Sequence, residues 1–200
     1  MAKRAHLARI AMLITASVAL TWCHGDEIDS DEAARAAYLG LDGVIEKALN
    51  LGMDGYNAAS SANIPEQSTA GDVGGTLTVS GQVDQGSSDN KEMRLLLTLV
   101  EYRDEVPDTD LVITYDTDDA ALPELDLSLR NIPSGTFTGT LVGDVYMVGD
   151  IEGRVTLNLT LSGQIEPGDA EDDIRRVVGS TTVTGTATSS YGTYAVDVAL

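Results

Sequence analysis

The chain of 200 residues has few of the side chains on which enzymes most often rely. Its only cysteine is Cys23, and its two histidines are His6 and His24. The absence of both residue types after residue 24 excludes Ser–His–Asp and Cys–His mechanisms there, and also zinc sites built on imidazole or thiolate. Neither a phosphate-binding GxxxxGK(S/T) loop nor a strand-linked GxGxxG motif occurs. We therefore expect no catalytic residue, no metal site and no cofactor, and hence no enzyme.

Basic and aromatic residues are scarce as well. Only 12 Lys and Arg residues accompany 32 Asp and Glu residues, so the formal net charge is −20 at pH 7. This sign argues against nucleic acid as a partner and against direct docking on anionic lipid. Aromatic residues make up only 4% of the chain, which argues against the aromatic platforms of a sugar-processing site. We interpret the acidic surplus as a means of solubility outside the cell.

The N-terminal 22 residues have the layout of a secretory signal peptide. Lys3, Arg4 and Arg9 lie in a first segment without acidic residues, and residues 10–22 then carry no charge. A basic segment followed by an apolar one is typical of signal peptides. The apolar run is shorter than the roughly 20 residues that a membrane-spanning helix needs. We therefore predict a cleaved signal peptide at residues 1–22 and export to the cell envelope, the periplasm or the extracellular space.

The position of Cys23 directly after the apolar run suggests lipid attachment. Residues 20–23 (LTWC) resemble the end of the signal peptide of bacterial lipoproteins, where the chain is cut before a cysteine that becomes acylated. The resemblance implies a lipid at Cys23 and a membrane contact through that lipid alone. Trp22 departs from the pattern, because lipoproteins have a small residue at this position. The alternative is ordinary cleavage, for instance after Ala19 or Gly25, which leaves Cys23 free or removed.

A helical segment is predicted after a short tether at residues 23–30. Between residues 31 and 62, apolar side chains recur at steps of three and four, as in an amphipathic helix that Ser30 is placed to cap. They are Tyr38, Leu41, Ile45, Leu49, Met53 and Tyr56. Glycines at positions 40, 43, 52 and 55 predict either a break near 40–43 or a close approach to a neighbouring surface. The polar face lacks the Lys and Arg of membrane-lying helices, so we expect the segment to cover the domain's own sheet.

After a loop predicted at residues 59–75, apolar and polar residues alternate with a period of two, as in half-buried strands. About eight mostly antiparallel strands are expected, near residues 77–83, 92–103, 110–116, 125–130, 136–148, 155–165, 176–188 and 191–200. We predict a single domain at residues 31–200 of α+β class, mainly β, in which the helical segment precedes an antiparallel sheet. The sheet is expected either as a sandwich or as a curved sheet covered by the helix.

Two further patterns are weak. The segment LTVSGQVDQG at residues 77–86 matches LTLSGQIEPG at 159–168, as a duplicated hairpin would, although strands rich in Thr and Gly also resemble each other by chance. Acidic clusters at residues 104–110, 116–119 and 169–173 offer oxygen ligands for calcium, but the EF-hand spacing is missing. We interpret the clusters as solvated turns that bind calcium weakly and non-specifically at most.

These features favour a non-catalytic exported envelope protein with a structural or partner-binding role, tethered by a lipid if Cys23 is acylated. The partner is an unidentified protein. One alternative is a carrier that encloses a small apolar ligand between the helix and a curved sheet. A further alternative is a small outer-membrane β-barrel, because alternating strands run to the C-terminal Leu200. The scarcity of aromatic residues and the helical segment speak against the barrel.

We predict that acylation at Cys23 places the protein in the detergent phase when cells that express it are phase-partitioned. Each buried acyl methylene contributes about 0.8 kcal/mol, so two or three acyl chains hold the domain on a membrane despite its negative charge. Cys23→Ser should move the protein to the aqueous phase, and Trp22→Gly should accelerate processing. A parent protein that is already water-soluble, with a mature N-terminus beyond Cys23, would contradict acylation.

Overall fold

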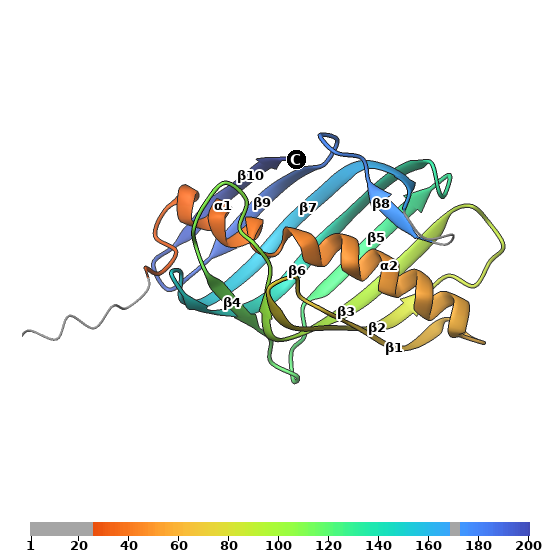
Figure 1. Ribbon diagram of the computed structural model, residues 1–200, viewed down its shortest axis with the longest axis horizontal. Coiled ribbons are helices and arrows are strands. Elements are labelled where there is room, and N and C mark those ends of the chain that lie inside the picture. The colour runs from red at the N-terminus through yellow and green to blue at the C-terminus, as the bar shows by residue number, and fades with distance from the viewer. Residues whose placement is uncertain (1–25, 169–172) are drawn as a thin grey trace, which may run out of the picture.

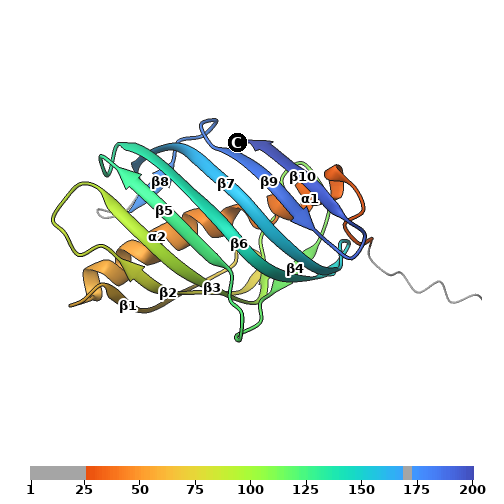
Figure 2. The ribbon, with the colours of Figure 1, turned by 180° about the vertical axis from the view of Figure 1, so that it is seen from behind.

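The computed structural model describes residues 26–168 and 173–200. The predicted signal peptide at residues 1–22 and the predicted lipid attachment site Cys23 lie outside these residues. In the described part, ten antiparallel strands form one strongly curved sheet, and two helices lie across one of its faces (Figures 1 and 2). The predicted mainly β class with N-terminal helical structure is confirmed. Of the two expected arrangements, the curved sheet covered by helices is the one observed.

The helices come first along the chain and the strands follow. Helix α1 spans Asp31–Leu39 and α2 spans Asp42–Ala58. The strands are β1 (Asn63–Ala70), β2 (Gly74–Val83), β3 (Lys91–Arg103), β4 (Ile113–Asp116), β5 (Glu124–Arg130), β6 (Gly135–Gly149), β7 (Gly153–Pro167), β8 (Ile174–Arg176), β9 (Thr182–Thr188) and β10 (Thr193–Ala199). Their order across the sheet is β1-β2-β3-β4-β6-β7-β9-β10. Strand β5 lies end to end with β4 between β3 and β6, and the short β8 pairs with β7.

Two of the ten strands differ from the predicted pattern. Strand β1 lies inside the predicted loop 59–75, because its sequence NIPEQSTA buries only Ile64 and therefore shows no alternation. It is an edge strand, where a proline such as Pro65 is tolerated. The predicted strand 176–188 is divided into β8 and β9 by a turn in which the Ser180 N–H bonds to the Val177 carbonyl. Gly179 has a φ of +79° in this turn, a conformation that favours glycine.

The predicted helical segment forms two helices, because the chain breaks at Gly40 and Leu41. Ser30 caps α1 as predicted, since its Oγ accepts a hydrogen bond of 3.2 Å from the Ala33 N–H. The glycines of α2 also provide the predicted close approach to a neighbouring surface. A Cβ on Gly52 would lie 3.0 Å from the Met93 Sδ, and a Cβ on Gly55 would lie 2.8 Å from the Ile64 Cδ1. Helix α2 therefore rests directly on β1 and β3.

The helices and the sheet enclose one apolar core. Helix α2 contacts β1, β2 and β8 and α1 contacts β10, so the helices bridge the two edges of the curved sheet (Figure 1). Leu157, Leu159 and Leu161 of β7 point into this core and are at most 1% exposed. The residues between them, such as Thr160, face solvent on the outer side of the sheet, which carries no helix (Figure 2). This is the burial pattern that a period of two predicts.

Residues 26–30, predicted as the end of a tether, are packed on the folded domain. Ile28 is only 1% exposed. The Asp26 N–H donates to the Asp150 carbonyl at 3.1 Å, and the Ser189 Oγ donates to the Ile28 carbonyl at 2.6 Å. The folded domain therefore includes residue 26, rather than beginning at residue 31.

The two copies of the weak repeat lie on β2 and β7. Leu77 and Val79 of the first copy are buried, as are Leu159 and Leu161 of the second. Strand β2 pairs with β3 over most of its length, whereas β7 pairs only briefly with β8 and then extensively with β9. The copies thus share the burial pattern of a strand, but not the pairing of one hairpin.

We predict that Gly55→Ala destabilises the protein although alanine is the better helix former. Alanine in a helix interior gains about 1 kcal/mol over glycine. The new methyl would lie 2.9 Å from the Ile64 Cβ, which side-chain rotation cannot move, and overpacking of this kind costs about 1–3 kcal/mol. Urea unfolding should show a net loss of up to about 2 kcal/mol. In the control Gly86→Ala the nearest atom is 4.0 Å away, so unchanged stability is expected. An increase in stability for Gly55→Ala would contradict the close packing of α2.

Candidate functional site

The outer face of the sheet carries an open depression of about 720 Å³. It extends over β2, β3, β5, β6 and β7, on the side of the sheet away from the helices. The polar residues of its lining are Gln82, Asp84, Glu92, Arg94, Asp126, Ser128, Thr138, Thr140 and Thr160. The lining also includes Ala62, Val83, Met93 and Leu127, so the hollow combines charged groups and hydroxyls with apolar surface.

The register of the strands brings these residues together from distant parts of the chain. Arg94 on β3 is the pairing partner of both Gln82 on β2 and Asp126 on β5. Asp126 is in turn paired with Thr140 on β6, and Thr140 is paired with Thr160 on β7. All five side chains therefore lie in one transverse row, with neighbouring strands about 4.8 Å apart.

Asp126 lies in the middle of this row, and one of its two carboxylate oxygens is shielded but unpaired. Its Oδ1 is buried and has no hydrogen-bond partner among the residues that the structure describes. Arg94 lies directly opposite, yet its guanidinium donates to the Oε1 of Gln82 at 2.7 Å. The nearby Glu92 accepts hydrogen bonds from Arg130 and from the Ser128 Oγ. The Asp126 Oδ1 is therefore a shielded carboxylate oxygen that lacks a donor.

A second hollow of about 580 Å³ lies beside the loop between β3 and β4. It contains Asp104, the first acid of a predicted calcium cluster. The Asp104 carboxylate is already engaged, because it pairs with the Lys47 Nζ at 2.8 Å and accepts hydrogen bonds from the Asp72 N–H and the Tyr102 hydroxyl. It therefore anchors α2 to the end of β3 and is not available as a free ligand.

The other acidic clusters do not assemble a metal site in the described part of the chain. Asp116 accepts a hydrogen bond of 2.8 Å from the Glu101 N–H, and Asp118 accepts one of 2.9 Å from the Ala120 N–H. Both carboxylates thus support the local backbone. Within residues 26–168 and 173–200, no group of three or more His, Cys, Asp or Glu side chains is arranged to hold a metal ion. Most of the third predicted cluster, at residues 169–172, lies outside these ranges.

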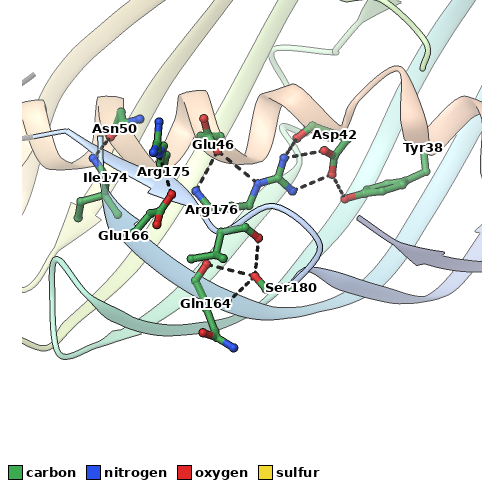
Figure 3. Close-up of polar contacts among 11 residues, drawn as sticks. Tyr38, Asp42, Glu46, Asn50, Gln164, Glu166, Ile174, Arg175, Arg176 and Ser180 are labelled. Atoms are coloured by element: carbon green, nitrogen blue, oxygen red, sulfur yellow. Dashed lines mark hydrogen bonds and ion pairs between the residues drawn. The ribbon is translucent and has the colours of Figure 1, made fainter. Parts of the chain in front are cut away.

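A partly buried polar network anchors the other side of α2 to β8 (Figure 3). The Arg176 guanidinium forms a bidentate pair with Asp42, at 2.9 and 2.6 Å, and its backbone N–H donates to Glu46. The Tyr38 hydroxyl donates to the same Asp42 carboxylate at 2.6 Å. The Asn50 Oδ1 accepts from the Ile174 N–H at 2.9 Å. Asp42, Glu46 and Asn50 follow at steps of four and so lie on one face of the helix.

Burial and charge shift the pKa values of groups in these networks. Burial alone would lower the pKa of Arg176, but its hydrogen bonds to Asp42 and the charge of that carboxylate outweigh this effect and raise the pKa. The pKa values of Tyr38 and Tyr102 are raised by burial, and further by the hydrogen-bonded carboxylates of Asp42 and Asp104. Burial also raises the pKa of Tyr115. These groups keep fixed protonation states at neutral pH, as structural residues do.

The depression was not predicted from the sequence, although the alternation of period two identified the strands on which its polar residues lie. Arg94, Asp126, Thr140 and Thr160 are all polar positions in strands that the alternation of period two identifies. The alternation predicts that these side chains face solvent, but it does not predict which strands are neighbours in the sheet. The transverse row depends on register, which became apparent only in the folded structure.

Comparisons of the chain with protein-family models, with curated protein sequences and with solved structures find no match. Among residues 26–168 and 173–200, neither helix has the length and apolar character needed to cross a membrane.

We predict a steep loss of stability above pH 10 that depends in part on Tyr115. Unfolded tyrosines ionise near a pKa of about 10, and the folded protein raises the pKa of Tyr115 above this value. Its contribution is fully present below pH 10 and is lost as the pH rises toward the folded pKa. Tyr115→Phe should therefore reduce the slope of unfolding free energy against pH by up to about 1.4 kcal/mol per pH unit.

The measurement is a series of urea unfolding curves from neutral pH to above pH 10. Tyr115→Phe also removes the hydrogen bond from its hydroxyl to the Ala37 carbonyl, so stability at pH 7 should fall by about 1 kcal/mol. Tyr191→Phe is the matched control, because Tyr191 is 64% exposed. An equal slope for Tyr115→Phe and the parent would contradict the raised pKa.

Proposed function

We propose that the chain is a non-catalytic exported envelope protein that binds a partner protein through the outer face of its sheet. The observation that carries the proposal is the difference between the two faces. Helices α1 and α2 cover one face, whereas the outer face is bare and bears the depression around Asp126. Export is proposed from the signal-like residues 1–22, and attachment to the membrane from the position of Cys23.

Exposed apolar side chains on the outer face support a role in protein binding. Leu96 and Val142 lie on either side of Glu124 in one transverse row, and Tyr146 and Val148 follow along β6. They are surrounded by threonines and charged residues. Apolar side chains inside a polar surround are typical of surfaces that bind other proteins.

Surface binding is favoured over the alternative of a small apolar-ligand carrier. A carrier needs space between the helix and the sheet. Gly52 and Gly55 bring α2 so close to Met93 and Ile64 that even a methyl group would collide there. A ligand could enter at this place only if α2 moved away from the sheet, against the Asp42–Arg176 and Lys47–Asp104 pairs.

The proposal is tested by photo-crosslinking in cells that export the chain. A photoreactive amino acid in place of Thr160 or Thr184, both exposed on the outer face, should give one protein adduct of defined mass. The same amino acid in place of Asn57, which is exposed on α2, should not. Added parent protein should reduce the yield of the adduct, because its outer face competes for the same partner.

A matched competitor makes the test specific. Thr160→Lys should fold as the parent does, because exposed substitutions change stability by only about 0.5 kcal/mol, but it places a long charged side chain in the transverse row. We expect it to compete poorly. Equal competition by Thr160→Lys, or adducts that form equally from Asn57, would contradict binding through the outer face.

A further inference from the structure

The folded part of the chain begins close to the proposed lipid attachment site. Asp26 is fixed on the β6–β7 turn, because its N–H donates to the Asp150 carbonyl at 3.1 Å and its carbonyl accepts from the Glu152 N–H at 3.2 Å. Only three peptide steps separate Cys23 from Asp26, and they span at most about 11 Å. A lipid at Cys23 would therefore hold the domain by a short link rather than by a long tether.

Two exposed valines lie beside Asp26. Val112 and Val148 are 55% and 63% exposed. The Val112 N–H donates to the Asp150 carboxylate at 2.7 Å, and Asp150 is also the residue whose carbonyl bonds to Asp26. The register of β4 and β6, continued by one residue, makes Val112 and Val148 diagonal neighbours. We call this part of the molecule, where the described chain begins, the entry end.

An exposed tyrosine completes the entry end on the side of β9 and β10. Tyr191 lies in the β9–β10 turn and is 64% exposed. The preceding Ser190 donates from its Oγ to the Glu27 carboxylate at 2.6 Å, so this turn is joined to the first described residues. Tyrosine side chains are enriched at membrane–water interfaces, because the ring is apolar and the hydroxyl is polar. The entry end thus presents apolar and amphipathic side chains around the start of the folded chain.

The charge of the entry end argues against attraction to anionic lipid. Four carboxylates gather there, those of Asp26, Glu27, Asp150 and Glu152. The whole chain also carries a formal net charge of −20. An anionic surface repels such a group. Contact with a bilayer would therefore depend on the apolar side chains, and it would be strongest on lipid without net charge.

We propose that the entry end rests on a zwitterionic lipid bilayer, with Val112, Val148 and Tyr191 at the bilayer surface and the lipid of Cys23 as the anchor. The proposal rests on the proposed function, because it requires that lipid, and it adds a contact made by the protein itself. Three side chains bind a bilayer only weakly. The acyl chains and the short link keep these side chains at a high effective concentration near the bilayer, and so make the weak contact effective.

This contact orients the domain. The entry end lies at one end of the long axis of the molecule, and the loop between β2 and β3 lies at the other end (Figure 1). Along β6, a rise of about 3.3 Å per residue places Thr140 roughly 30 Å from Gly149 at the entry end. The depression therefore stands away from the bilayer. Leu96 and Val142 on the outer face remain accessible to a partner protein.

The test is fluorescence quenching by spin-labelled phosphatidylcholine in vesicles that carry the acylated protein. Thr188→Cys or Thr182→Cys provides the thiol for the fluorophore, since the only other cysteine is Cys23 and acylation consumes its thiol. The two positions are matched, because both threonines are exposed on β9 and each shares one hydrogen bond through its Oγ1. Thr188 lies at the entry end and Thr182 roughly 20 Å further along the strand. We expect quenching at position 188 and little at position 182.

A triple variant tests the side chains themselves. Serine in place of Val112, Val148 and Tyr191 removes the apolar contacts without a change in charge. The variant should lose the quenching at position 188 but stay in the detergent phase, because the acyl chains still anchor it. Val178→Ser is the control, because Val178 is 97% exposed but lies between β8 and β9 at the far end of the strands. It should leave the quenching unchanged.

Lipid composition provides a readout that needs no triple variant. Anionic phosphatidylglycerol mixed into the vesicles should reduce the quenching at position 188 when the salt concentration is low, because the carboxylates of the entry end are repelled. High salt should restore the quenching, because it screens this repulsion. Stronger quenching in the anionic vesicles would contradict a contact made by apolar side chains.

The outcomes separate this inference from the proposed function. Equal quenching at positions 188 and 182, or quenching that survives the triple variant, would overturn the bilayer contact. If the protein nevertheless stays in the detergent phase and gives outer-face crosslinks, the proposed function remains. A parent protein without an acyl group would overturn both the lipid anchor and the bilayer contact, and the crosslinks alone would then decide whether the outer face binds a partner.

Discussion

Two ion pairs hold α2 from opposite sides, and the position of this helix decides which surfaces of the molecule remain accessible. Lys47 joins the helix to Asp104 at the end of β3, and Asp42 joins it to Arg176 on β8. Their charged groups are at most 19% exposed, so replacing Lys47 or Arg176 would leave the carboxylate of Asp104 or Asp42 without its cation. Such losses cost about 3–5 kcal/mol, whereas intact pairs add little net stability. We infer that the pairs mainly specify one position of the helix on the sheet.

The same position requires glycine along the contact face of α2. Gly43 is adjacent to the Asp104 carboxylate, and Gly52 and Gly55 lie against β3 and β1. A larger residue at any of the three would lift the helix and lengthen the ion pairs. The lower helix propensity of glycine is therefore offset by close packing and by the geometry of the charges. With one face of the sheet filled in this way, the outer face is the broad surface left for contact with other molecules.

The sequence was sufficient for the fold class, because hydrophobic periodicity reports burial directly, but it did not decide between a sandwich and a curved sheet. The change from a period near 3.6 to a period of two located the helices and most of the strands. Strand β1 was missed because an edge strand that buries only Ile64 has no period to detect. Asp126 was not identified for a different reason. It is one of 32 acids, and its lack of a partner depends on where Arg94 points, which no pattern along the chain encodes.

The orientation of Arg94 also explains why the depression is a more informative feature than the ion pairs around α2. Asp42 and Asp104 are shielded carboxylates whose donors lie within the domain. Asp126 has one shielded oxygen without a donor, although the Arg94 guanidinium in the same row is a suitable donor. That guanidinium is bonded to the neutral Gln82. Arg94 and Asp126 therefore form no ion pair, although the register of β3 and β5 places the two residues opposite each other. Local departures from satisfied pairing are expected where a chain sacrifices stability for recognition. The paired acids belong to the scaffold that holds α2 on the sheet. Asp126 lies on the outer face, which we propose as the interaction surface.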